Sequence, residues 1–443
     1  MNSHILFALF SLFCSTYAAS TPVCRDGFKL VNRKKCLKSF PDYKLHDEAE
    51  AVCRGYGGTL VTIKNAADNR AVSDLAGGHS NPFVWLGVYC FSNVTTSCYL
   101  DDNSGPLTYS NFATGYPKRD AQYGGCVYMT TYGPDVGKWF SSPCEYTGLE
   151  YVCEVPSTVD DKACTHNYNG NCYLPSHELS INTPNTTYQT AQNICKSINA
   201  RLVSIHSKSE IDYIKSLYTN SGIQQITLGA QAFMQDTFDW TDGSSFDFDN
   251  FDPLATTKGN CLQMDLSSRV DNGMWSQINC QTVNYFVCKR KAGVAVTVAK
   301  KEEQEEEEEE KDVNPKFKFQ MVTEKRELPI QHLDLSDLCN STLFIAPGVI
   351  TSFGYPAAQP PITYCTWKVA VVGAYRLGIY FTDFSVMYPV NIYVEKNNLL
   401  ASPKYEMKPF SVLAPYNMVT LTHDSAKDAE LQFHGFSATI LPY

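Results

Sequence analysis

The sequence predicts a multidomain protein, in which two disulfide-closed domains of mixed helix and strand (α+β) are followed by an all-β domain. Two features of the 443-residue chain carry this prediction. One is an arrangement of cysteine and tryptophan that occurs twice, and the other is a change to alternating apolar residues near the C-terminus. A strongly acidic run between these regions predicts a boundary, and the length suits roughly three domains.

The duplicated arrangement covers most of the first two thirds of the chain. In each copy a tryptophan precedes the next cysteine by five residues, and the enclosing cysteines are 18 residues apart in one copy and 19 in the other. The offset between the copies, near 136 residues, is far longer than a solenoid repeat and therefore predicts duplicated whole domains. The residues are Cys126, Trp139, Cys144 and Cys153, and then Cys261, Trp275, Cys280 and Cys288.

Both copies begin with the same predicted elements. Residues 42–55 place apolar side chains at helical spacing, residues 57–63 alternate as a short strand, and a second helix follows from Asn65. In the second copy the predictions are helices at 188–198 and 208–217 around a strand at 200–205. The short apolar runs beyond them, broken by Gly, Asp, Asn and Pro, predict small antiparallel sheets and long loops.

The cysteine counts indicate an oxidising compartment. Residues 5–13 form an apolar run followed by small residues, which predicts a cleaved signal peptide over residues 1–19 rather than a buried helix, although no Lys or Arg precedes it. Without Cys14, 16 cysteines divide into eight, six and two among the three regions. Even counts indicate internally closed disulfides, which persist outside the cytosol. No later apolar stretch is long enough to span a membrane, so we expect a secreted, extracellular protein.

Most of the acidity lies in one segment. The formal net charge is −10, and residues 300–312 alone contribute −6. This run has no apolar residue to bury and its like charges repel, so we predict a disordered linker over residues 290–335, with an acidic docking site as the alternative. The small remaining charge argues against nucleic acid as a partner, because nucleic-acid binding depends on clustered Lys and Arg.

Both copies resemble C-type lectin-like domains of the long form, which open with a disulfide-closed hairpin. Besides the cysteines, residues 84–87 and 226–229 resemble the family's Trp-Ile-Gly-Leu motif, and Trp240, Asp242 and Gly243 strengthen the second match. The resemblance covers residues 24–154 and 164–289. It implies the pairs Cys24–Cys36, Cys53–Cys153, Cys126–Cys144, Cys164–Cys172, Cys195–Cys288 and Cys261–Cys280, which leaves Cys90 and Cys98 for each other.

The C-terminal region, residues 336–443, resembles a CUB-like domain. Strand-like alternation occurs at residues 375–384 and 390–394, after a Tyr355-Pro356 turn and the run Cys365 to Trp367. The resemblance implies an antiparallel sandwich with a Cys339–Cys365 disulfide, whereas the second disulfide usual in that family is absent. Two C-type lectin-like domains followed by a CUB-like domain resemble the architecture of secreted nematode proteins.

The calcium ligands of sugar-binding family members are not matched. Those members use a Glu-Pro-Asn or Gln-Pro-Asp loop and a Trp-Asn-Asp strand, and calcium needs six to eight oxygen ligands. Here Tyr116 and Lys118 flank the loop proline, and Phe140 and Ser141 follow Trp139. The second copy has a shorter loop, and Ser276 and Gln277 follow its tryptophan. We therefore expect no metal and no other cofactor.

Acidic residues in two regions of the chain leave metal binding open as an alternative. Asp247, Asp249 and Asp252 could hold an ion, but ordinary turn chemistry is favoured. In the CUB-like region Asp383 stands where that family has a calcium ligand, but Asn391 replaces another acid.

One loop of the first copy is the candidate ligand site. Exposed Tyr and Arg side chains stack on sugars and anchor interfaces, and loops on disulfide-stiffened scaffolds often carry function. A solvated loop of a spacer domain is the alternative. The candidate residues are Tyr116, Lys118, Arg119, Asp120 and Tyr123.

Three sequons predict N-glycosylation at Asn93, Asn185 and Asn340. We expect no enzyme, because the chain has no metal-binding His pair, no nucleophile elbow and no spare cysteine. The predicted function is a secreted recognition protein that binds glycans or glycoproteins without calcium, with an extension to microbial surfaces and innate defence. The alternative is a protein-binding or matrix protein that uses the same domains. The sheet edges of the CUB-like domain also allow self-association.

Overall fold

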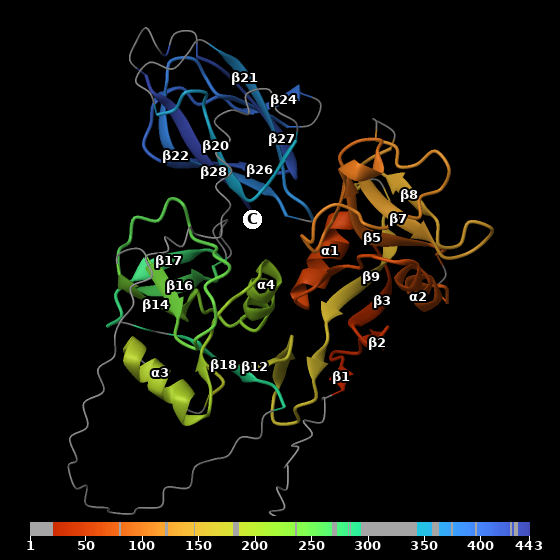
Figure 1. The fold of residues 1–443 in the computed structure, drawn as a ribbon, viewed down its shortest axis with the longest axis horizontal. Coiled ribbons are helices and arrows are strands. Elements are labelled where there is room, and N and C mark those ends of the chain that lie inside the picture. Colours follow the sequence, from red (N-terminus) through yellow and green to blue (C-terminus); the bar gives the residue numbers. More distant parts are fainter. Residues whose placement is uncertain are drawn as a thin grey trace, which may run out of the picture.

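The computed structural model contains three domains (Figure 1). It describes residues 21–78, 81–119, 123–145, 147–179, 186–234, 237–267, 273–281, 283, 285–293, 343–356, 363–373, 375–394, 397–425, 428 and 433–443. The expected signal peptide, and all of the expected acidic linker after residue 293, lie outside the described residues. The first two domains each combine two α-helices with sheets, and the described part of the third is built from strands.

The first domain is built on a mixed sheet with the strand order β2-β3-β9-β5-β7-β8, in which β4 joins β9 and β6 joins β5. Its first helix begins later than residues 42–55 predict, because residues up to Lys44 extend the strand that pairs with β9. The elements are β1 (Pro22–Val23), β2 (Lys29–Val31), β3 (Lys35–Lys44), α1 (His46–Gly55), β4 (Thr59–Leu60), α2 (Ala66–Ala76), β5 (Phe83–Cys90), η1 (Thr95–Ser97), β6 (Cys98–Leu100), β7 (Cys126–Thr130), β8 (Trp139–Ser142), β9 (Leu149–Pro156) and β10 (Thr158–Val159).

The second domain repeats this plan with two separate sheets, β11-β12-β18-β13 and β15-β14-β16-β17. Its helices lie where the periodicity predicts them, and the Ser207 side chain caps the second by accepting a hydrogen bond from the Glu210 amide. The elements are β11 (His166–Tyr168), β12 (Asn171–Pro175), α3 (Tyr188–Ser197), β13 (Arg201–Leu202), α4 (Lys208–Ser216), β14 (Gln225–Met234), β15 (Thr237–Trp240), β16 (Cys261–Asp265), β17 (Trp275–Ile278) and β18 (Val287–Lys291).

Seven disulfides join cysteines in the expected pairs. Two of them tie the first helix of a domain to its last strand, Cys53 to Cys153 and Cys195 to Cys288. The other five are Cys24–Cys36, Cys90–Cys98, Cys126–Cys144, Cys164–Cys172 and Cys261–Cys280. Cys365 is also disulfide-bonded, while Cys339 lies outside the described residues.

The C-terminal domain is a β-sandwich. One sheet has the order β19-β21-β27-β23-β24, and the other β20-β28-β22-β25 with β26 on β22. Inward-facing residues of both sheets, including Trp367, Phe381 and Phe436, form one core. The elements are β19 (Phe344–Ile345), β20 (Gly348–Thr351), β21 (Tyr364–Ala370), β22 (Leu377–Val386), β23 (Asn391–Val394), β24 (Asn398–Ala401), β25 (Tyr405–Glu406), β26 (Phe410–Ala414), β27 (Met418–Asp424) and β28 (Gly435–Pro442).

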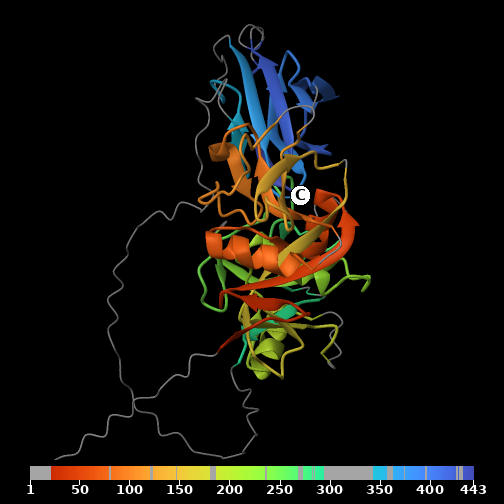
Figure 2. The same ribbon diagram turned by 90° about the vertical axis from the view of Figure 1, so that its right-hand side faces the viewer.

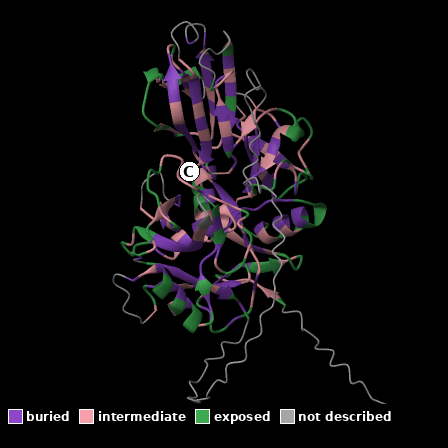
Figure 3. Ribbon diagram, turned by 60° about the vertical axis from the view of Figure 1, so that its left-hand side comes forward, coloured by how far each residue is buried: buried purple, intermediate pink, exposed green. Residues whose placement is uncertain are grey.

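The three domains contact one another around α1 and α4, which face each other beneath the C-terminal domain (Figure 1). The turned view shows the strands of the C-terminal domain standing above the other two domains (Figure 2). Buried residues follow the strands of every domain (Figure 3). The Tyr168 hydroxyl of the second domain donates to the Gly57 carbonyl of the first at 2.7 Å. None of the four α-helices in the described ranges has the length and apolarity that crossing a bilayer requires.

One glycine in each of the first two domains allows a close backbone crossing, and this can be tested. A Cβ at Gly87 would collide with the Leu60 carbonyl oxygen, and one at Gly229 with that of Leu202. We expect Gly87→Ala and Gly229→Ala each to lower the free energy of unfolding by about 1–3 kcal/mol, because backbone must shift to admit the methyl group. Thermal unfolding of the purified protein measures this.

Gly55→Ala is the matched control for these variants. A Cβ at Gly55 meets nothing within 4 Å, and the residue lies at the exposed end of α1. This variant should be as stable as the wild type or slightly more stable. Equal melting temperatures for all three variants would contradict the close crossing.

Candidate functional site

The candidate loop forms an aromatic surface together with two strands. The Tyr116 ring meets Phe140 edge-on, with centroids 5.0 Å apart, and meets Tyr123 at 6.0 Å. Phe140 in turn stacks on Tyr128, with centroids 5.5 Å apart. We call these four residues the aromatic strip. Tyr128 and Phe140 are half-buried and lie directly opposite each other on β7 and β8, while Trp139 beside Phe140 points into the core.

A lysine lies over the aromatic strip. The Lys118 Nζ atom is 4.8 Å from the ring centroids of both Tyr116 and Tyr123. Its backbone amide donates to Ser141 Oγ at 2.9 Å, which ties the loop to β8. An ammonium group over two tyrosine faces is a cation–π arrangement, so the strip offers apolar faces, hydroxyl groups and a positive charge side by side.

These side chains do not fit a calcium ion. Phe140 has no oxygen in its side chain, and Ser141 Oγ already accepts the Lys118 amide. The Lys118 ammonium group over the same strip repels a cation. The described side chains at this position are therefore not the oxygen ligands that calcium needs.

The other candidate residues are not all part of the strip. Arg119 turns the opposite way, so that its Nη2 donates to the Tyr89 hydroxyl at 3.2 Å and its backbone amide donates to Asn93 Oδ1. Asp120 lies outside the described residues. Thus Tyr116, Lys118 and Tyr123 come together, whereas Arg119 joins the loop to that of the first sequon. Asn93 is exposed, and Asn185 and Asn340 lie outside the described residues.

Two of the three acids in the acidic group of the second domain are engaged locally. Asp247 Oδ1 lies 2.7 Å from His206 Nδ1, and Asp252 Oδ1 accepts the Leu254 amide at 2.9 Å. In the C-terminal domain Asp383 contacts the Tyr355 hydroxyl at 2.8 Å and His434 Nε2 at 3.1 Å. Among the residues that the structure describes, no three His, Cys, Asp or Glu side chains are close enough to hold a metal ion.

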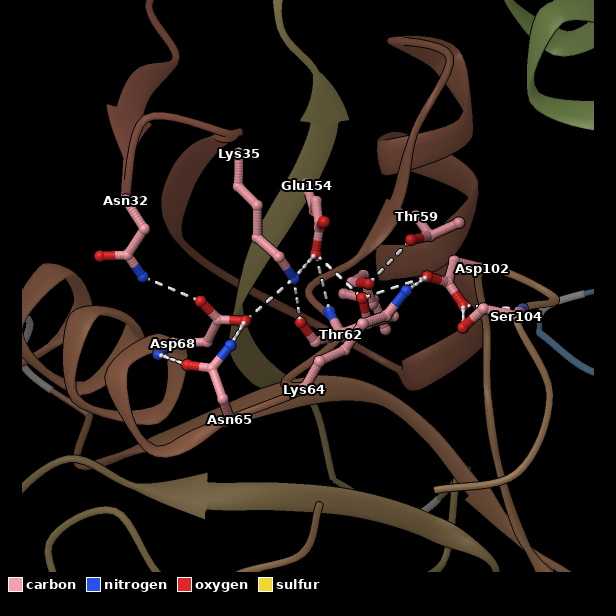
Figure 4. A network of polar contacts seen from close by, with 11 residues as sticks. Asn32, Lys35, Thr59, Thr62, Lys64, Asn65, Asp68, Asp102, Ser104 and Glu154 are labelled. Atoms are coloured by element: carbon pink, nitrogen blue, oxygen red, sulfur yellow. Dashed lines mark hydrogen bonds and ion pairs between the residues drawn. The ribbon is translucent and has the colours of Figure 1, made fainter. Parts of the chain in front are cut away.

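A partly buried polar network lies between β3, β9 and α2 (Figure 4). The Lys35 ammonium group is 3.1 Å from Glu154 Oε2 and 3.4 Å from Asp68 Oδ2, and it donates to the Thr62 carbonyl at 2.7 Å. Nearby, Lys64 pairs with Asp102 at 2.6 Å. Two carboxylates and a carbonyl would suit a divalent cation, but here a lysine occupies their centre.

The corresponding network of the second domain also contains a lysine, but this lysine comes from a different strand. Lys289 directly follows Cys288, as Glu154 follows Cys153, and its ammonium group lies 2.6 Å from Glu210 Oε1. It also donates to the Ser204 carbonyl at 2.9 Å. Sequence reasoning missed both networks, although the acids at the third position of α2 and α4 were a signal that could have indicated them.

One chain of contacts in the second domain has the order of a catalytic triad without its chemistry. His206 Nε2 lies 3.2 Å from Ser204 Oγ, and its Nδ1 contacts Asp247. However, Ser204 is 1 % exposed and its hydroxyl donates to Asp242 Oδ2 at 2.6 Å. The serine is therefore neither reachable nor free to give its proton to the histidine.

A cavity of about 820 Å³ lies between the first and second domains. Arg54 and Lys215 in its lining are balanced by Asp212 and Asp265, so its described lining does not select a charged ligand. The aromatic strip remains the surface with the more specific chemistry.

Comparisons with known proteins agree with the duplication. A family model described as the lectin C-type domain matches residues 44–155 and 185–290. C-type lectin domain-containing protein 38 of Caenorhabditis elegans is 34% identical over 278 residues, which are 62% of this chain and 70% of that protein. The secretory phospholipase A2 receptor of Oryctolagus cuniculus is 25% identical over 266 residues, which are 56% of this chain but 17% of the receptor.

Solved structures match single domains. A calcium-independent type II antifreeze protein is 24% identical, and the match covers 28% of this chain and 88% of that one with a TM-score of 0.23. The cow carbohydrate-recognition domain of CD23, solved in the presence of a GlcNAc2Man3 oligosaccharide, is 21% identical, with 30% and 100% covered and a TM-score of 0.25. Likenesses at these TM-scores do not bear on what this chain binds.

The lysine at the centre of the first network gives a stability prediction. We expect Lys35→Met to lower the free energy of unfolding by about 3 kcal/mol at neutral pH, because Asp68 and Glu154 then face each other without a cation. Chemical denaturation at neutral pH measures it.

The adjacent Lys34→Met serves as the control, since Lys34 is exposed and the change should stay within about 0.5 kcal/mol. A Lys35→Met protein as stable as the control at neutral pH would show that the ammonium group does not hold the network together.

Proposed function

This chain belongs to the family of proteins that contain C-type lectin domains, and on that basis we propose that it is a secreted recognition protein that binds glycans without calcium. Members of this family are generally binding proteins rather than enzymes. The observation that carries the proposal is the aromatic strip with Lys118 above it.

The chemistry of the strip suits a saccharide. The apolar face of a sugar ring stacks on an aromatic ring, and its hydroxyl groups accept hydrogen bonds from ammonium and phenol donors. Tyr116 and Tyr123 supply faces and hydroxyl groups, and Lys118 supplies a donor between them. Tyr128 and Phe140 lie on two paired strands and hold the loop tyrosines of the strip in place. These side chains therefore lose little conformational entropy when a ligand binds.

The same residues support calcium independence. A calcium-dependent mode would need several oxygen ligands around the loop, where Lys118, Phe140 and Ser141 stand instead. In the second domain Ser276 and Gln277 follow Trp275, and the Ser276 hydroxyl accepts from the Gln263 amide at 3.1 Å. Neither domain offers a carboxylate at this position of the strand.

The rest of the proposal concerns location and assembly. The disulfides support an extracellular protein, with residues 1–19 as the secretion signal. Residues 290 and 291 belong to β18, so the proposed spacer is the part of residues 290–335 that follows this strand. The two-sheet sandwich supports a CUB-like assignment for residues 336–443, whose edge strands allow self-association. Asn93 is exposed and we propose that it carries a glycan, as we do for Asn185 and Asn340. Microbial surfaces are the proposed source of the glycans, in innate defence.

A protein-binding or matrix role is the second candidate. Tyr116 and Arg119 of the candidate loop are residue types that also anchor protein interfaces. Free sugar separates the two roles, because millimolar monosaccharide should compete with a glycan but leave a protein interface intact.

The first test is binding of the secreted protein to a glycan array and to whole bacteria, with calcium and with EDTA. We expect the same signal in both buffers, because the strip contains no metal ligand set. A signal that disappears in EDTA would contradict calcium independence. Signal in neither buffer, together with capture of a protein partner that monosaccharide cannot release, would favour the second candidate.

The second test locates the site. Tyr116→Ala and Lys118→Ala should each weaken glycan binding about 3- to 10-fold, because each removes one stacking or cation–π contact. Tyr132→Ala is the matched control, since Tyr132 is 80% exposed on the loop between β7 and β8. Isothermal titration with the best glycan from the array measures the affinities. Equal losses in all three variants, or none, would place the site elsewhere.

A further inference from the structure

One tyrosine of the C-terminal domain is held by both lectin domains. The Tyr375 side chain is buried, and its hydroxyl donates to Asp212 Oδ2 of α4 at 2.8 Å. The Arg54 guanidinium group of α1 lies over the same ring, with Cζ 4.6 Å from the centroid. Beside them, Arg376 pairs with Asp47 of α1 at 2.6 Å. We call this meeting point of the three domains the junction.

Two fully buried carboxyl groups lie beneath the junction. Glu50 Oε2 accepts the Leu60 amide at 2.5 Å, but its Oε1 has no hydrogen-bond partner among the described residues. Both carboxyl oxygens of Asp101 also lack a hydrogen bond of good geometry there. Burial raises the pKa of Asp101 by more than the nearby Gly373 backbone amide lowers it. Gly373 of the C-terminal domain covers the pair, since a Cβ at Gly373 would lie 3.7 Å from Glu50 Oε1 and 3.5 Å from the Asp101 carbonyl oxygen.

The second lectin domain shows that the fold does not require acids at these positions. Gln192 is the fifth residue of α3, as Glu50 is of α1, and it accepts the Leu202 amide at 3.3 Å as Glu50 accepts that of Leu60. Thr241 precedes Asp242 as Asp101 precedes Asp102, and each of these aspartates accepts the amide of the serine two residues on. In the second domain, therefore, neutral side chains occupy these positions. There the corresponding position does not contact Gly373.

From this difference we propose that Glu50 and Asp101 hold protons when the C-terminal domain is docked, so that the junction loosens as the pH rises. A carboxyl group with an unpaired oxygen is tolerated in a dry site only in its neutral form. Undocking removes Gly373, admits water and allows the carboxylates to ionise. The proposal concerns domain docking and does not depend on glycan binding.

The charges around the pair do not remove this cost. Burial raises the pKa of Glu50 to about 7 and raises that of Asp101 well above its usual range. His46 Nε2 lies 3.8 Å from Asp101 Oδ2, but burial lowers the pKa of His46 to about 4, so the imidazole is neutral. Arg54 is shared with Tyr375 and Asp212.

Three more lysines lie near the junction, and two of them are paired with aspartates. Lys64 is paired with Asp102 and Lys215 with Asp212. Burial lowers the pKa of Lys208, whose Nζ lies 5.7 Å from the Tyr375 ring, to about 8.

The sign of the effect follows from proton counting. The docked state binds protons on Glu50 and Asp101 that the open state releases above its ordinary carboxyl pKa of about 4. Their contribution to docking is therefore complete near pH 4 and is lost as the pH rises toward 7. Near pH 8 Lys208 also loses its proton, which sets the upper limit of the range in which the two carboxyl groups alone are tested. The useful window is pH 5 to 8.

The test uses the full secreted protein across this window. Hydrogen exchange of α1 and α4 reports docking locally, and small-angle X-ray scattering reports overall dimensions. After correction for the intrinsic pH dependence of amide exchange, we expect exchange in both helices to rise with pH together with the radius of gyration. The docking constant should fall up to about tenfold per pH unit for each proton released. Tyr375→Phe removes the hydroxyl donor to Asp212 and should raise exchange at every pH, which confirms that the readout follows docking.

Glu50→Gln and Asp101→Thr install the residues of the second domain. Each should lessen the pH dependence, and the double variant should stay docked at pH 8. Asp74→Asn, at an exposed acid of α2, should keep the wild-type profile. A wild-type profile that is flat between pH 5 and 8 would overturn the proposal. So would an unchanged profile in the double variant, and if one single variant is not secreted the other decides.

Discussion

The bridge from the first helix to the last strand of each lectin domain is the constraint on which the other features depend. Cys53 is bonded to Cys153, and Cys195 to Cys288, over separations of 100 and 93 residues. Closing loops of this length removes much of the entropy of the unfolded chain. Because Arg54 and Glu154 directly follow the bridged cysteines, the same bond fixes where α1 meets the C-terminal domain and where Glu154 meets Lys35.

The duplication kept this scaffold and redistributed the charges on it. In the first domain the cation of the buried network comes from Lys35 on β3, and in the second it comes from Lys289 on β18. In each domain the lysine pairs with the acid at the third position of the second helix. The strand that supplies the lysine differs between the domains, whereas the ion pair is present in both. The acids beneath the junction are not shared by the two domains. Glu50 has the neutral counterpart Gln192, and only the acidic version lies under another domain.

The sequence could predict what depends on spacing and not what depends on register or docking. Cysteine and tryptophan spacing predicted the two domains, and the family resemblance supplied their pairings, because these features are local or shared. The sequence placed two members of the strip, Tyr116 and Tyr123, in one loop with Lys118. The other half of the strip required the pairing of β7 with β8, which places Tyr128 opposite Phe140.

Two further features were beyond sequence reasoning for physical reasons. Arg119 belongs to the same loop as Lys118 but turns to Tyr89, and loop composition does not specify that direction. The junction joins Tyr375 to Asp212 across 163 residues, and each partner alone is an ordinary polar residue.

Packed aromatic side chains connect the strip to the junction. The ring centroid of Trp85 lies 6.3 Å from that of Tyr128 and 5.3 Å from that of His46. Such continuity does not by itself couple the two places, because coupling needs an element with two arrangements. Trp85 is fully buried and its Nε1 donates to the Lys44 carbonyl, which holds the ring in place. Because every residue of the strip belongs to the first domain, we expect the strip to stay intact whether or not the C-terminal domain is docked.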